Sequence, residues 1–172
     1  MKKKSSTEEQ DKKFIRITIE LAKLAKTENN FPFGAILVKD NKIVAKAHDK
    51  SYTSFDPTKH AEIELISKFC KKNKLLSLEG HTLYSSTEPC NMCAGAIHWA
   101  KISKIVYSVP QKELNKLSGV TPKIPCDKII NSCINKYTKE AEIVGSVLLE
   151  EGIKVFEDFK LIPKSVKIKS KI

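Results

Sequence analysis

The chain has 172 residues, which favours a single domain large enough to bury a hydrophobic core without disulfide bonds. Hydrophobic residues make up 41% and charged residues 30%, a balance typical of globular proteins, and the formal net charge is +11. No apolar run approaches the ~20 residues of a membrane span and none follows the basic N-terminus, so we expect neither a membrane protein nor a secretory signal.

The first third of the chain predicts a tail, a helix and a hairpin. Residues 1–10 are polar, charged and without periodicity, and we expect a disordered tail. From residue 11 to about 28, apolar residues recur every three or four positions and predict an amphipathic helix. Residues 35–38 and 42–47 predict two strands joined by a tight turn.

Helices and strands alternate through the middle of the chain. Residues 49–58 form a polar loop that is either an ordinary linker or, given its position just before His60, the rim of a site. Helices are predicted over 61–73 and 90–100, each followed by a strand. The strands are predicted over 81–86 and 102–109. We expect Trp99 and Tyr107 in the core.

The last third is harder to interpret. It predicts a short helix over 111–117, a loop with two prolines, and helical spacing over 127–137. Residues 143–144 suggest an edge strand and 146–159 a closing amphipathic helix. Alternating helices and strands indicate an α/β domain, a central sheet covered on both faces, over residues 11–160.

The positive charge concentrates in lysine, and only Arg16 is an arginine. Residues 161–172 form a basic C-terminal tail without an acidic residue. This charge would attract RNA, yet base recognition usually depends on arginine. We therefore favour a solvated, lysine-rich surface over a nucleic-acid interface.

Two separated motifs together predict a catalytic zinc site. His60, Cys90 and Cys93 supply one nitrogen and two sulfur ligands, and three protein ligands leave the fourth tetrahedral position open to water. Glu62 lies two residues after the histidine and can carry protons. A Cys-x-x-Cys pair alone could instead be a redox pair or half of a structural zinc site. The other cysteines, which show no disulfide spacing and favour a reducing, cytoplasmic setting, are Cys70, Cys126 and Cys133.

Helix starts bring these motifs together. Asp56-Pro57 precedes the histidine and Pro89 precedes the first cysteine, and both are helix-start signals. Cys90 and Cys93 are three residues apart and share a helix face. We therefore expect two helices whose first turns point at one zinc ion, where their positive ends favour anionic ligands.

Both motifs, in their longer form, resemble the cytidine-deaminase-like superfamily. Residues 56–63 and 87–97 look like the branch that holds bacterial guanine deaminases, nucleoside deaminases and tRNA adenosine deaminases. The resemblance implies a three-layer fold with a mixed five-stranded sheet between helices, one Zn²⁺ per chain and a homodimer. It also implies hydrolytic deamination, in which Glu62 takes the proton from water and returns protons to the ring and to the leaving ammonia.

The same resemblance narrows the substrate. Phe33 and the His98-Trp99 pair resemble the residues that guanine deaminases have at these positions. The positive net charge is instead similar to that of tRNA adenosine deaminases. Asp49 stands where the family usually has a substrate-binding asparagine, and an ionised aspartate only accepts hydrogen bonds. That suits the N–H groups of guanine. We expect a guanine-type purine substrate contacted by Asp49, by the backbone near Ala61 and by Phe33, whose ring is equally expected to be simple core.

Three alternatives remain open at the level of sequence. The first is a tRNA-specific adenosine deaminase, which would bind tRNA. The second is a cytosine- or cytidine-type deaminase. The third is a non-catalytic zinc module, against which Glu62 argues because a structural site has no use for it.

Overall fold

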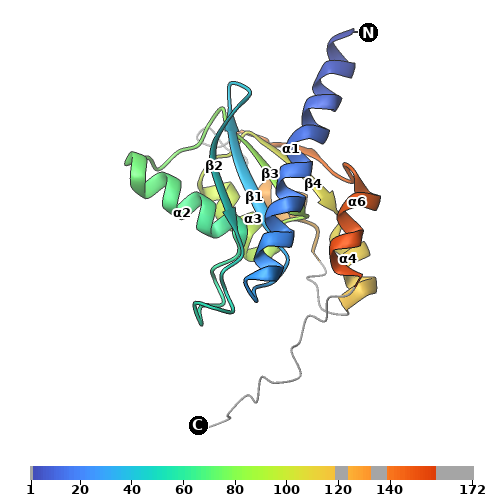
Figure 1. The fold of residues 1–172 in the computed structure, drawn as a ribbon. Coiled ribbons are helices and arrows are strands. Elements are labelled where there is room, and N and C mark those ends of the chain that lie inside the picture. The colour runs from blue at the N-terminus through green and yellow to red at the C-terminus, as the bar shows by residue number, and fades with distance from the viewer. Residues whose placement is uncertain (1, 119–123, 133–138, 158–172) are drawn as a thin grey trace.

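A mixed sheet between two layers of helices forms the body of the protein (Figure 1). The computed structural model describes residues 2–118, 124–132 and 139–157. This arrangement confirms the predicted three-layer α/β fold. Among the described residues, no helix is both long and apolar enough to cross a membrane.

The sheet has the strand order β2-β1-β3-β4-β5. Its strands are β1 (Gly34–Lys39), β2 (Lys42–His48), β3 (Thr82–Thr87), β4 (Lys104–Val109) and β5 (Glu142–Val144). The first three strands pair antiparallel, whereas β3, β4 and β5 run parallel. The predicted turn between β1 and β2 is tight, because Asp40 and Asn41 both adopt positive φ.

The first helix, α1 (Lys2–Thr27), is longer than predicted. Its course through residues 2–10 differs from the disordered tail that the polar composition suggests. Lys12 bridges Glu8 at 3.3 Å and Glu9 at 2.9 Å, and such pairs one turn apart favour continuation of the helix. The composition of residues 1–10 does not reveal these ion pairs, which depend on the spacing of Glu8 and Glu9 from Lys12.

Asp11 ties α1 to the sheet. The Tyr84 hydroxyl donates a 2.6 Å hydrogen bond to its Oδ1, and Lys104 Nζ lies 3.2 Å from its Oδ2. Lys104 also lies 3.3 Å from Glu142 on β5. This network, buried at Asp11 and Tyr84, fixes one face of β3 and β4 against α1.

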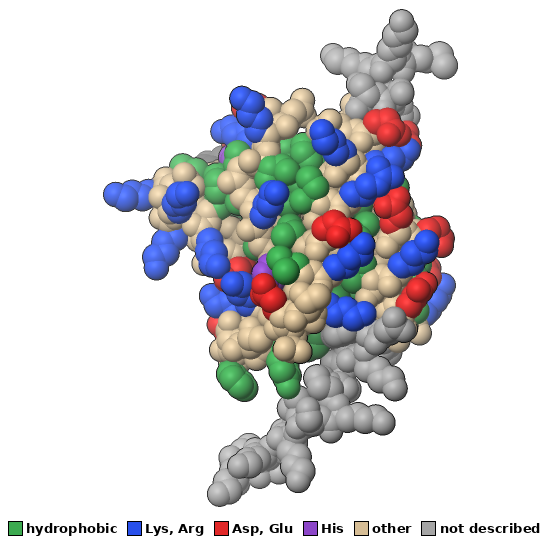
Figure 2. Space-filling view, in the orientation of Figure 1, with side chains coloured by type: hydrophobic (Ala, Val, Ile, Leu, Met, Phe, Trp, Pro, Cys, Tyr) green, Lys and Arg blue, Asp and Glu red, His purple; other side chains and the backbone are tan. Residues whose placement is uncertain are grey.

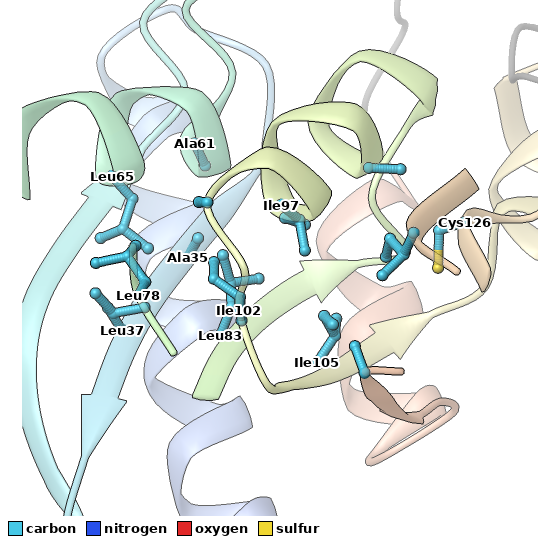
Figure 3. Packing of buried hydrophobic residues seen from close by; sticks show 14 of the residues in the cluster. Ala35, Leu37, Ala61, Leu65, Leu78, Leu83, Ile97, Ile102, Ile105 and Cys126 are labelled. Atoms are coloured by element: carbon cyan, nitrogen blue, oxygen red, sulfur yellow. The ribbon is translucent and has the colours of Figure 1, made fainter. Parts of the chain in front are cut away.

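One hydrophobic core lies between the sheet and α2, α3 and α5 (Figure 3). These helices are α2 (Ala61–Asn73), α3 (Asn91–Trp99) and α5 (Cys126–Ile130). Leu37, Leu83 and Ile105 point from three neighbouring strands toward them. The core holds the starts of α2 and α3 over the same part of the sheet.

The opposite face of the sheet packs a second core against α1 and the later helices. Those helices are α4 (Gln111–Ser118), α6 (Leu149–Ile153) and the 3-10 turn η1 (Lys154–Phe156). Ile36, Tyr84 and Val106 alternate with the residues of the first core along their strands. Two-sided burial explains why β1 and β4 are largely apolar, whereas β3 carries buried Ser and Thr residues.

Several predicted elements differ in extent from those observed. The closing helix expected over 146–159 begins only at Leu149, because Ser146 and Leu148 adopt positive φ, which a helix does not accept. The helix expected over 127–137 corresponds to α5, which ends at Ile130. Residues 133–138 and the basic tail 161–172 lie outside the described residues.

The prediction that Trp99 lies in the core is wrong, since 79% of this residue is exposed. Trp99 is the last residue of α3 and shares the outer face of that helix with Met92, which is also exposed. Residue type suggested burial, but the inward face of α3 is taken by Cys93 and Ile97. Tyr107 is half-buried and packs against the first core.

Candidate active site

Two helix starts present the predicted zinc ligands. His60 occupies the N-cap position of α2, and Cys90 occupies the N-cap position of α3. Both have extended backbone, with ψ of 156° and 172°, and neither uses its side chain as a cap. Cys93 follows in the first turn of α3. All three side chains are therefore free to turn toward one point beyond the helix ends.

The distances at this point fit a metal ion. His60 Nδ1 lies 3.5 Å from Cys90 Sγ and 3.6 Å from Cys93 Sγ, and all three ligand atoms lie within 4.8 Å of one another. Zinc bonds of about 2.1 Å to nitrogen and 2.3 Å to sulfur, at tetrahedral angles, would place these atoms roughly 3.6 Å apart. The nitrogen and sulfur donors present thus suit zinc.

Glu62 lies beside this cluster in the first turn of α2. Its carboxylate is buried, with Oε2 3.4 Å from Cys93 Sγ. Ser85 on β3 donates a 3.0 Å hydrogen bond from Oγ to Oε1. This contact fixes the carboxylate beside the group formed by His60, Cys90 and Cys93. Proton transfer requires a carboxylate within hydrogen-bond reach of the reactant.

The metal-free cluster already contains opposite charges. Contact with the Cys93 thiol, aided by His60, lowers the pKa of Cys90 to about 4 against the effect of burial. Burial lowers the pKa of His60, but Cys90 and Glu62 outweigh it and raise the pKa to about 9. Burial, followed by the charge of Cys90, raises the pKa of Glu62. A bound cation would take the place of the imidazolium and thiol protons.

Asp49 is fully buried just after β2. Its Oδ1 accepts hydrogen bonds from the Ser51 backbone N–H at 2.9 Å and from Ser51 Oγ at 2.7 Å. Among the described residues, Oδ2 has no hydrogen-bond partner. Burial raises the pKa of Asp49, with the hydrogen bonds of Ser51, the charge of His60 and the backbone of Phe31 acting in the opposite direction. One oxygen of this buried carboxyl group thus lacks a hydrogen-bond partner in the described part of the chain.

Phe33 and Ala61 complete the predicted contact residues. The Phe33 ring centroid lies 6.2 Å from that of His60 and 6.0 Å from that of Phe156. The half-buried Phe33 ring therefore lies beside the site and also contacts the core, so both sequence interpretations describe part of its position. Ala61 is buried as the first residue of α2, next to His60.

Sequence reasoning missed two polar residues that support the site. Ser85 hydrogen-bonds Glu62, and Glu88 hydrogen-bonds the starts of α4 and α5. A run of hydroxyl residues at the end of a predicted buried strand was the available signal for Ser85, because buried hydroxyls need partners. Nothing local indicates the role of Glu88, since its partners lie 23 and 38 residues further along the chain.

Comparison with known families agrees with this geometry. Residues 8–109 match the cytidine and deoxycytidylate deaminase zinc-binding region. The chain belongs to this family. The match spans α1 to β4 and includes both helix starts of the metal cluster. It confirms the resemblance inferred from the motifs, and the chemistry of the family is zinc-dependent hydrolysis of C–N bonds in deamination.

The similar proteins are named for more than one substrate. The chain is 33% identical to the tRNA-specific adenosine deaminase of Bacillus subtilis, over 83% of each chain. It is 47% identical to the guanine deaminase of the same organism, over 45% of this chain and 49% of that protein. A solved structure from a study of A-to-I editing by tRNA:A34 deaminases superposes with a TM-score of 0.67 at 25% identity, covering 83% of this chain and 97% of that one.

Proposed function

We propose that His60, Cys90 and Cys93 hold one zinc ion and that the protein hydrolytically deaminates a guanine-type purine, releasing ammonia. The three donor atoms and their spacing support this ligand set. When bound, zinc supplies a Lewis acid that makes water a nucleophile near neutral pH.

Glu62 moves the protons of the reaction. Its buried carboxylate takes a proton from the attacking water and passes it to the ring nitrogen, and then takes the proton of the newly added hydroxyl and passes it to the departing amine. Ser85 holds Oε1, which leaves Oε2 on the side of the cysteines. A buried, raised-pKa carboxylate beside the cluster also argues against a purely structural zinc module.

The choice of guanine rests on Asp49 Oδ2, which has no hydrogen-bond partner among the described residues. As a carboxylate it accepts hydrogen bonds and donates none, and its Oδ1 is already taken by Ser51. The amide edge of guanine offers N–H donors at N1 and N2, which match this acceptor. The distance of 6.2 Å between the Phe33 and His60 rings supports the proposal that Phe33 stacks on a face of the purine.

Editing of adenosine in tRNA is the second candidate. The 33% identity to a tRNA-specific adenosine deaminase and the net charge of +11 favour it. Against it, N1 of adenine needs a donor, which an ionised Asp49 does not provide. Figure 2 shows the Lys and Arg side chains spread over the visible face with acidic side chains between them, a distribution without an obvious RNA track.

The oligomeric state is inferred from the resemblance to the family, and the cellular compartment from the cysteines. We infer a homodimer, which the exposed Trp99 and Met92 on the outer face of α3 support. The free cysteines among the described residues support a reducing, cytoplasmic setting.

Ammonia release from a panel of substrates tests the choice of purine. The zinc-loaded protein is given guanine, guanosine, cytosine and a tRNA anticodon stem-loop with a wobble adenosine. We expect the highest kcat/KM with guanine, and little change when the salt concentration is raised, because guanine is neutral. Turnover of only the stem-loop, falling steeply with salt, would replace guanine by RNA as the substrate.

A further inference from the structure

Glu88 is joined to two later parts of the chain, residues 109–111 and the start of α5. Its Oε2 accepts a 3.0 Å hydrogen bond from the backbone N–H of Gln111, the first residue of α4. Its Oε1 accepts a 3.0 Å hydrogen bond from the backbone N–H of Cys126, the first residue of α5. The Glu88 N–H donates to Val109 O at 2.8 Å. One carboxylate thus meets two positive helix ends at once.

The residue between Glu88 and the first cysteine is held as well. Gln111 donates a buried 2.6 Å hydrogen bond from Nε2 to the carbonyl oxygen of Pro89. The short segment that leads into Cys90 is therefore fixed by Glu88 on one side and by Gln111 on the other. Neither residue lies in the metal cluster itself.

The far end of α3 is anchored to the same helix, α5. His98 donates a 2.7 Å hydrogen bond from Nδ1 to the carbonyl oxygen of Ile130. Because Glu88 joins the start of α5 to the segment before α3, the two helices are connected at both ends. These contacts surround the helix that carries Cys90 and Cys93 without involving either cysteine side chain.

We propose that Glu88 is a positioning residue that, together with Gln111, holds the Cys90–Cys93 turn in the geometry required for tight zinc binding. Zinc needs all three donors at nearly fixed separations, and α3 has to be placed against α2 to within a fraction of an ångström. The contacts of Glu88 supply that restraint from outside the cluster. The inference rests on the zinc ligands proposed above and is independent of the substrate.

Zinc affinity of the metal-free protein, measured against a competing chelator, tests this role. Glu88→Ala should lose about 10- to 100-fold in affinity, as removal of outer partners of metal ligands typically does. Glu88→Gln should lose less, because its amide oxygen still accepts one backbone N–H. Gln111→Ala should also weaken binding. The cobalt(II) spectrum, which reports thiolate ligation, should change in Glu88→Ala and recover in part in Glu88→Gln.

The control is Glu113→Ala, which removes a glutamate of α4 that pairs with Lys116 rather than with the cysteine segment. It should bind zinc as the unchanged protein does. Folded Glu88→Ala with unchanged zinc affinity would overturn the proposal. If Glu88→Ala does not fold, unchanged affinity in both Glu88→Gln and Gln111→Ala would do so. Failure of the unchanged protein to bind zinc would instead refute the ligand assignment itself.

Discussion

A buried carboxyl group without a full set of partners stabilises a fold poorly and is retained for another reason. Asp49 has one oxygen bonded to Ser51 and one oxygen without a partner among the described residues. Burial makes its ionised form costly, which is the physical meaning of its raised pKa. A substrate that donates hydrogen bonds would relieve this cost, so the recognition role proposed for Asp49 predicts a cost in stability at the same residue.

We expect Asp49→Asn to unfold at higher denaturant concentration at neutral pH. The pKa of Asp49 is higher in the folded than in the unfolded state. Its contribution to the free energy of unfolding is therefore fully favourable at pH values below the ordinary aspartate pKa, and it is lost as pH rises through the pKa of the folded state. The advantage of asparagine should therefore vanish in acid and grow with pH, by about 1.4 kcal/mol for each unit by which the pKa is raised. Urea unfolding of the metal-free proteins across pH measures it.

Asp56→Asn is the control with the opposite sign. Hydrogen bonds from Thr58 lower the pKa of Asp56. Its contribution to the stability of the fold is therefore present at pH values above the ordinary aspartate pKa, and it is lost as pH falls through the lowered pKa of the folded state. The asparagine variant should lose stability relative to the unchanged protein as pH rises. Equal stability of Asp49→Asn and the unchanged protein at every pH would show that burial of Asp49 carries no cost.

At the scale of elements, the site depends on how closely helices and strands approach. Gly34 begins β1 directly beneath α1, and a Cβ there would meet the carbonyl oxygen of Thr18 and lie 2.6 Å from Leu21 Cβ and 2.7 Å from the backbone nitrogen of Ala22. Only glycine allows this approach. The strand that follows leads through β2 to Asp49, so the α1–β1 contact also affects the position of this proposed substrate-binding residue.

Gly34→Ala should therefore destabilise the protein by about 1–3 kcal/mol or more, because backbone atoms of α1 have to move. Gly95→Ala is a matched control, since a Cβ at Gly95 meets nothing within 4 Å. Alanine there, within α3, should stabilise by up to about 1 kcal/mol. Denaturant unfolding compares the two, and equal effects of both substitutions would contradict the close packing of α1 on β1.

The helix starts were predictable because their signals are local. His60, Cys90 and the spacing to Cys93 already indicate two helix ends facing one metal ion, and the structure brings these side chains together. Ser85 and Glu88 were not predictable, because their roles depend on partners far along the chain. The local sequence pattern indicates where a helix begins, whereas contacts between distant parts of the chain determine which elements the helix packs against.

At the scale of the whole molecule, the sequence predicts the layered fold correctly but not the extent of its ends. The three-layer order follows from alternating strands and helices, whereas the length of α1 depends on Lys12 pairing and on the Asp11–Tyr84 contact. The exposure of Trp99 likewise depends on how α3 is oriented in the whole fold. Lys and Arg side chains are spread over the face shown in Figure 2, and the net charge of +11 does not by itself define a partner.

Ammonia release by the zinc-loaded protein, with Glu62→Gln in parallel and zinc content measured on both, tests the central claim most directly. We predict that Glu62→Gln keeps its zinc, because Glu62 is not among the three donors, and loses activity by at least about 100-fold, because the proton carrier is gone. Near-normal ammonia release by a zinc-containing Glu62→Gln variant would contradict the proposed mechanism.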